Sequence, residues 1–149
     1  MKKIIALILT IIFITCSFVS CGTSSDKPWS IFGYTPLGVV SPSMEPLIKV
    51  GDLIIIKEVD VNDIKVGDVI CFLDPTSSSE TKVLITHRIA DIYVEDGKSF
   101  AITVGDMNSV VDVTPLELND ENVIGMYTGT RISSIGGFLN KLHLIRMTF

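Results

Sequence analysis

Residues 83–104, VLITHRIADIYVEDGKSFAITV, decide the fold class because they join strand patterns to a tight turn. Apolar residues alternate through the first seven positions, and His87 falls on the apolar face of that predicted strand. The Asp-Gly pair at 96–97 lies between two further β-rich runs, which is typical of a two-residue hairpin loop. The stretch therefore predicts antiparallel strands.

Other short apolar runs on either side of this stretch are bounded by turn residues, as strands are. These runs are 53–56, 69–73 and 123–127, and a Gly-Asp pair precedes each of the first two. Residues 138–142 follow a Gly-Gly pair and are compatible with a short amphipathic helix. With no internal repeat and no long helical pattern, we expect a mainly antiparallel β domain over residues 37–149.

Length, charge and cysteine content exclude several classes of protein. The chain has 149 residues, enough for one domain, and a formal net charge of −5, which argues against nucleic acid as a partner. Its three cysteines are Cys16, Cys21 and Cys71, and only the last lies in the body of the chain. A disulfide-stapled fold is therefore excluded, and we expect Cys71 to be a small buried apolar residue.

The first 21 residues form a charged and then apolar leader. Lys2 and Lys3 precede an apolar run that continues, diluted, to Val19. That run would make roughly 24 Å of helix, shorter than a hydrocarbon core of about 30 Å. The segment is either a cleaved signal peptide or a short membrane anchor, and in both cases the rest of the chain is exported. Residues 22–36 are expected to be a juxtamembrane linker.

Phe18-Val19-Ser20-Cys21-Gly22 resembles a bacterial lipobox, which makes Cys21 a candidate for lipidation. A lipoprotein and an uncleaved anchor both remain open. Either one predicts a protein held at the cell membrane, with the lipid bilayer as a partner and the β domain on the extracytoplasmic face. The apolar residues of 29–34, three of them aromatic, would then lie either near the membrane interface or in the core.

Ser41-Pro42-Ser43-Met44-Glu45-Pro46 places a hydroxyl between two prolines. Each proline fixes its own φ and restricts the residue before it, so Ser43 lies on a segment with little freedom. A surface turn would explain the same residues. A nucleophile, however, also requires this kind of preorganisation.

Serine attacks efficiently only when a base removes its proton, and histidine can do so near neutral pH. A carboxylate on the other ring nitrogen then holds the tautomer and stabilises the imidazolium. The chain supplies Ser43, then His87, and then a loop carrying Asp106 and Asp112. Together these residues predict a serine hydrolase.

Each residue also has an alternative explanation. A single strand histidine can be a hydrogen-bonded core residue. The acidic loop could bind calcium, although valines at 110 and 111 fall where an EF-hand-type loop needs other residues. A Ser-Lys pair would need Lys49, Lys57, Lys65 or Lys82 with a strongly altered proton affinity. No metal-ligand spacing or nucleotide fingerprint is present, so we expect neither metal nor cofactor.

Five motifs, in the same order along the chain, resemble those of the type I signal peptidases. Ser41–Pro46 resembles the serine box S-G-S-M-x-P, and Gly51–Ile54 resembles the strand that follows it. Gly67–Ile70 resembles the next box, Thr86–Ile89 the base box, and Gly105–Asp112 the pattern G-D-x-N-x-x-x-D. A histidine in the base box resembles the pattern of the ER-type branch of this family. That branch is found in eukaryotes, archaea and some Gram-positive bacteria.

The resemblance implies a membrane-attached serine endopeptidase that removes signal peptides from exported preproteins after small residues at −1 and −3. It makes Ser43 the nucleophile, His87 the general base and Asp112 the orienting carboxylate. Asp106 is a required neighbour of Asp112 or competes for its role. The Ser43 N–H and the Ser41 hydroxyl would form the oxyanion hole, in which Pro42 replaces the usual glycine. The alternative is a non-catalytic surface lipoprotein with a β interaction module.

Overall fold

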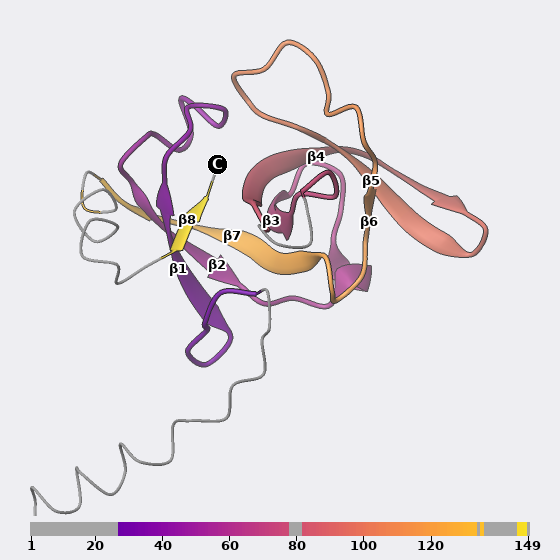
Figure 1. Ribbon diagram of the computed structural model, residues 1–149, viewed down its shortest axis with the longest axis horizontal. Coiled ribbons are helices and arrows are strands. Elements are labelled where there is room, and N and C mark those ends of the chain that lie inside the picture. Colours follow the sequence, from indigo (N-terminus) through magenta and orange to yellow (C-terminus); the bar gives the residue numbers. More distant parts are fainter. Residues whose placement is uncertain (1–26, 78–81, 134, 136–145, 149) are drawn as a thin grey trace, which may run out of the picture.

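The computed structural model describes residues 27–77, 82–133, 135 and 146–148, and these form one curled β sheet (Figure 1). The predicted leader, the lipidation candidate Cys21 and the predicted helix at 138–142 lie outside the described residues. The strands are β1 (Tyr34–Val39), β2 (Leu53–Lys57), β3 (Val69–Leu73), β4 (Leu84–Glu95), β5 (Lys98–Val104), β6 (Leu116–Glu117), β7 (Val123–Ile132) and β8 (Arg146–Thr148). A 3₁₀ turn, η1 (Val61–Asp63), lies between β2 and β3.

The spatial order of the strands is β6-β5-β4-β3-β7-β2-β1-β8. Every neighbouring pair is antiparallel except β1 and β8, which run parallel. The predicted mainly antiparallel β domain is therefore confirmed. β1 begins at Tyr34, inside the stretch predicted as a linker, whose bounds otherwise stay a prediction.

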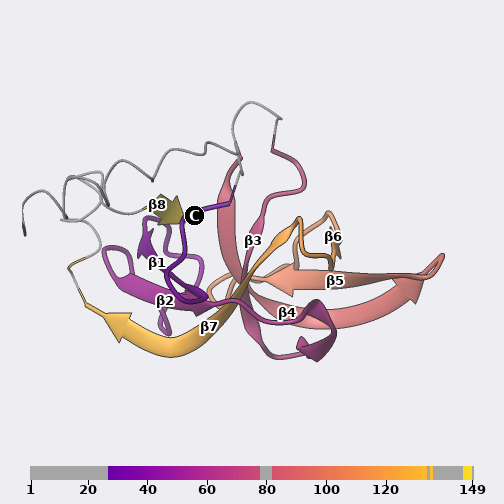
Figure 2. The ribbon, with the colours of Figure 1, turned by 90° about the horizontal axis from the view of Figure 1, so that it is seen from below.

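The predicted hairpin at 96–97 is confirmed, and it joins β4 to β5 (Figure 2). Asp96 and Gly97 both have positive φ, 49° and 77°, and Glu95 pairs with Lys98 across the turn. β4 is one strand of 12 residues, although its sequence suggests two runs. A register shift between Ile89 and Asp91 lets the strand continue through that irregularity.

Two apolar clusters make up the core. The first gathers residues of β1, β2, β3, β4, β7 and the segment after β1, namely Leu37, Val39, Met44, Ile48, Ile54, Ile56, Val69, Cys71, Leu73, Leu84 and Ile124. The second lies nearer the hairpin and contains Ile64, Ile70, Phe72, Ile89, Ala101, Leu116, Leu118 and Val123. Cys71 is fully buried, as expected. Successive residues of β3 belong to different clusters, so both of its faces are covered.

The Gly-Asp pairs that precede β2 and β3 end turns of the same construction, each within the sequence Lys-Val-Gly-Asp. A carboxylate oxygen of Asp52 accepts the backbone N–H of Lys49 at 3.0 Å, and Asp68 accepts that of Lys65 at 2.9 Å. Asp52 also accepts a bond from Arg131 of β7 at 3.0 Å. These aspartates therefore close the turns that lead into β2 and β3.

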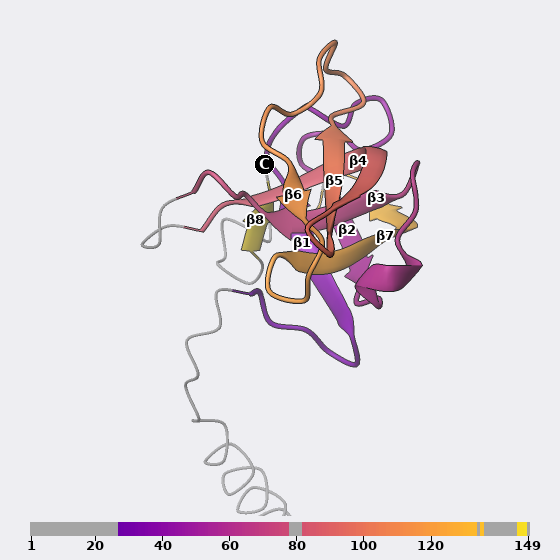
Figure 3. The same cartoon turned by 90° about the vertical axis from the view of Figure 1, so that its right-hand side faces the viewer.

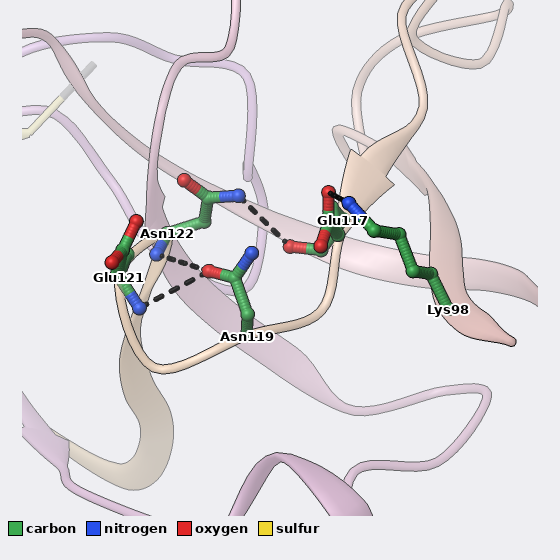
Figure 4. Close-up of polar contacts among 5 residues, drawn as sticks. All are labelled: Lys98, Glu117, Asn119, Glu121 and Asn122. Carbon is green, nitrogen blue, oxygen red and sulfur yellow. Dashed lines mark hydrogen bonds and ion pairs between the residues drawn. The ribbon is translucent and has the colours of Figure 1, made fainter.

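The turn between β6 and β7 is held by side-chain amides (Figure 4). The Asn119 side-chain oxygen accepts the backbone N–H groups of Glu121 and Asn122, and the Asn122 amide donates to the Glu117 carbonyl at 3.1 Å. Lys98 of β5 pairs with the Glu117 carboxylate at 3.1 Å and, as the main cause, lowers its pKa. These contacts hold the short β6 beside β5.

The aromatic residues before β1 lie on the surface. Trp29 is 50% exposed and Phe32 is 97% exposed. They are therefore not core residues, which leaves the interface alternative as a prediction. Within the described ranges, no helix is both long and apolar enough to cross a membrane.

Gly125 provides a test of the β2–β7 packing. A Cβ atom at this position would lie 2.2 Å from the carbonyl oxygen of Lys57, and φ is +152°. We expect Gly125→Ala to lower the free energy of unfolding by about 3 kcal/mol, because backbone atoms cannot move aside as a side chain can. Urea denaturation measures this change.

Gly129→Ala is the matched control on the same strand. Gly129 also has a positive φ, +82°, but nothing lies within 4 Å of its Cβ position. We expect a loss of only about 1 kcal/mol from backbone strain. Equal losses in the two variants would contradict the proposed close packing.

Candidate active site

Ser43 lies in the loop between β1 and β2, on a turn that the core holds in place. The N–H of Glu45 donates to the carbonyl of Pro42 at 2.9 Å, which closes the turn around Ser43. Met44 is 2% exposed and Ile48 is 1% exposed, and both belong to the first core cluster. Ser43 itself is half-buried. Its position is therefore set by core packing as well as by the prolines.

His87 lies near the start of β4, opposite Ile70 of β3, and is 7% exposed. Its Nδ1 is 2.7 Å from Oδ2 of Asp112, in the loop after β5. An ionised carboxylate only accepts hydrogen bonds, so Nδ1 carries the proton. In the neutral ring, Nε2 is then left as the acceptor. This is the tautomer that a general base requires.

The β1–β2 loop and the β5–β6 loop rise on the same side of the sheet (Figures 1 and 3). The two loops meet at Gly105. The N–H of Met107 donates to the Ser43 carbonyl at 2.9 Å. A Cβ atom on Gly105 would lie 2.7 Å from the Ser43 carbonyl oxygen and 3.0 Å from His87 Nε2. The Ser43 turn and the acceptor nitrogen of His87 therefore adjoin the same glycine.

The two aspartates of the loop have different partners. Asp106 receives two hydrogen bonds from Arg88, at 2.7 Å each, while Arg88 also donates to the Gly67 carbonyl at 2.7 Å. The hydrogen bond to Asp106 raises the pKa of Arg88, so the guanidinium stays charged. Arg88 follows His87 on β4 and therefore points to the opposite face. Asp106 thus anchors the loop from the far side of β4, and Asp112 contacts the histidine.

Ser41 contacts the backbone of Ser43. Its Oγ accepts the Ser43 N–H at 3.3 Å, which is long compared with a usual N–H···O distance of about 2.9 Å. The hydroxyl proton of Ser41 remains available to another acceptor. The two predicted oxyanion donors are therefore adjacent.

The lysines considered as alternative bases do not share the buried position of His87. Lys49, Lys57 and Lys65 are exposed, and Lys82 is half-buried. Among the described residues, no group of three or more His, Cys, Asp or Glu side chains is placed to hold a metal ion.

Thr103 was not predicted as a site residue from the sequence. Its hydroxyl donates to Oδ2 of Asp112, the same oxygen that contacts His87. Thr103 is 2% exposed and follows Ala101 on the buried face of β5. A polar residue at a core-facing position of an alternating strand is a signal that could have identified it.

No family model matches the chain. The chain is 38% identical over 123 residues to the protein named Signal peptidase I W from Bacillus subtilis (strain 168). The match covers 82% of this chain and 60% of that relative, so the chain spans about three fifths of the relative's length. Over most of its residues, the chain is thus similar to a signal peptidase I.

Proposed function

We propose that this chain is a type I signal peptidase, a serine endopeptidase that removes signal peptides from exported preproteins. The observation that carries the proposal is the meeting at Gly105, where the Ser43 turn adjoins Nε2 of a histidine whose Nδ1 contacts Asp112. The similarity to Signal peptidase I W supports the same conclusion.

In the proposed mechanism, Ser43 Oγ attacks the carbonyl carbon of the scissile bond while His87 Nε2 takes its proton. The imidazolium then returns that proton to the leaving amine, and water hydrolyses the acyl-enzyme by the same steps. Asp112 accepts from Nδ1 throughout and stabilises the imidazolium. A histidine base corresponds to the ER-type branch of the family.

The negative charge that develops on the carbonyl oxygen needs donors already in place. The Ser43 N–H is held by only a long contact with Ser41, and an oxyanion is a stronger acceptor than a hydroxyl. In the transition state, the Ser43 N–H therefore exchanges its bond to Ser41 for a hydrogen bond to the oxyanion. The Ser41 hydroxyl supplies a second donor.

We further propose that the enzyme acts at the external face of the membrane, held there by its leader or by a lipid on Cys21. Confining enzyme and membrane-bound precursor to one surface raises their effective concentration. The competing function, a non-catalytic surface lipoprotein with a β interaction module, predicts no turnover.

Precursor cleavage separates these two functions. We expect Ser43→Ala and His87→Ala each to lower kcat by at least about 1,000-fold, because they remove the nucleophile and its base. The measurement is processing of a purified precursor by the full chain in detergent or vesicles. Ser30→Ala, at an exposed serine whose hydroxyl bonds Glu58 and no residue of the site, is the control and should cleave normally. Cleavage that survives both substitutions would rule out the mechanism.

The roles of the two aspartates can be separated by amide substitution. We expect Asp112→Asn to lower kcat by about 100-fold or more, because an amide is a poorer partner for the His87 Nδ1–H and imidazolium. Asp106→Asn disrupts a partly exposed ion pair with Arg88 and should lower kcat by no more than about tenfold. Equal or reversed losses would show that the assignment of Asp112 is wrong.

An extended substrate is expected to add as a strand beside the Ser43 segment. The edge of β1 just before that segment pairs with β8, with Gly38 opposite Met147, and Cα atoms of β8 come within 8 Å of those of β4. β8 therefore occupies a position between the strand that leads to Ser43 and the strand of His87. We propose that β8 and the substrate compete for this edge.

Replacing Met147 and Thr148 together by proline should release β8, because proline removes the N–H groups that strand pairing needs. If β8 is paired with β1 in most molecules, the variant should lower KM by up to roughly tenfold without lowering kcat. The double alanine variant is the control and should retain the wild-type KM. An unchanged or raised KM in the proline variant would contradict competition.

A further inference from the structure

One oxygen of Asp112 has two donors. Oδ2 lies 2.7 Å from Nδ1 of His87 and also accepts the Thr103 hydroxyl. The backbone N–H of Asp112 donates to the Thr103 carbonyl at 2.8 Å. Thr103 therefore contacts both the main chain and the side chain of the residue that orients the histidine.

Thr103 is a rigid support for these bonds. It lies in β5, pairs with Ile89 of β4 and is almost completely buried. Threonine is branched at Cβ and has few side-chain rotamers, so its hydroxyl direction is restricted. Because His87 also lies on β4, the strand pairing sets Thr103 and His87 relative to each other.

The loop that carries Asp112 has little other anchorage near this residue. Val110 is 71% exposed and Val113 is 95% exposed, so neither side chain packs into the core. A cavity of about 250 Å³, lined in part by Asp112, Thr103 and Phe72, adjoins the carboxylate. Asp112 thus borders open space on one side, and its side chain is 29% exposed.

We propose that Thr103 is a positioning residue that holds the Asp112 carboxylate against His87 Nδ1. The proposal deepens the proposed peptidase function, on which its kinetic part rests. Thr103 does not touch the reacting atoms, and it acts through Asp112. With the carboxylate held, the Nδ1–H bond keeps the ring oriented so that Nε2 adjoins the Ser43 turn.

The test uses Thr103→Val, which keeps the branched shape and removes the hydroxyl, and Thr103→Ser, which keeps the hydroxyl. Hydrogen bonds to charged groups are among the stronger ones, so we expect Thr103→Val to lower kcat roughly 10- to 100-fold. KM should not change, and Thr103→Ser should restore most of kcat. Thr35→Val, at another threonine that is 2% exposed, is the matched control and should keep the wild-type kcat.

A double-mutant cycle shows whether Thr103 acts through Asp112. In an Asp112→Asn background, Thr103→Val should add less than about a twofold loss, because the carboxylate that it positions is already gone. The proposal would be overturned if the loss in kcat of the double variant equalled the product of the two single losses. A wild-type kcat in Thr103→Val would also overturn it.

A proton NMR spectrum tests the positioning without any substrate. The Nδ1–H of His87, bonded to a carboxylate, should give a downfield resonance in the wild type and in Thr103→Ser and be absent from Thr103→Val. If the wild type shows the resonance but cleaves no precursor, the proposed function fails and the positioning role stands. If Thr103→Val keeps the resonance, the positioning role fails while the peptidase function stands. Urea denaturation of each variant identifies a loss of folding. If Thr103→Val does not fold, the positioning role is judged by comparing the resonance and kcat of Thr103→Ser with those of the wild type.

Discussion

The close approach of two loops at Gly105 is the constraint on which the candidate active site depends. Only a residue without a side chain allows the carbonyl of Ser43 and the ring of His87 to lie so near the same backbone. The backbone bond from Met107 to Ser43 fixes this contact. The serine turn and the histidine come from opposite parts of the strand order, and this junction brings them together.

The fold supplies rigidity on each side of that junction. Met44 and Ile48 fix the serine turn in the first core cluster, while Ile70 and Ile89 of the second cluster flank His87 through strand pairing and along β4. The Arg88–Asp106 pair secures the start of the acidic loop from the opposite face of β4. Preorganisation of this kind lowers the cost of reaching a reactive geometry. The conformational entropy is lost when the chain folds, before any substrate binds.

Much of the fold followed from local patterns. Alternation predicted the strands around His87, and the Asp-Gly pair at 96–97 predicted the hairpin, because each depends on residues close together in sequence. The continuity of β4 through Ala90 did not follow, since a bulge is stabilised by the partner strand. The exposure of Phe32 did not follow from the sequence either, because an apolar residue before a strand can be buried in the core or exposed on the surface.

The sequence by itself determined the chemical groups, their order and the antiparallel class, since these depend on residue type and short-range period. Only the tertiary structure decided which aspartate contacts His87. Asp106 and Asp112 share one loop, and their partners lie on opposite faces of a strand about 20 residues earlier in the chain. The contact between Thr103 and Asp112 and the pairing of β8 with β1 were decided in the same way. Such contacts join residues from different strands and loops, whose approach is set by the packing of the whole sheet.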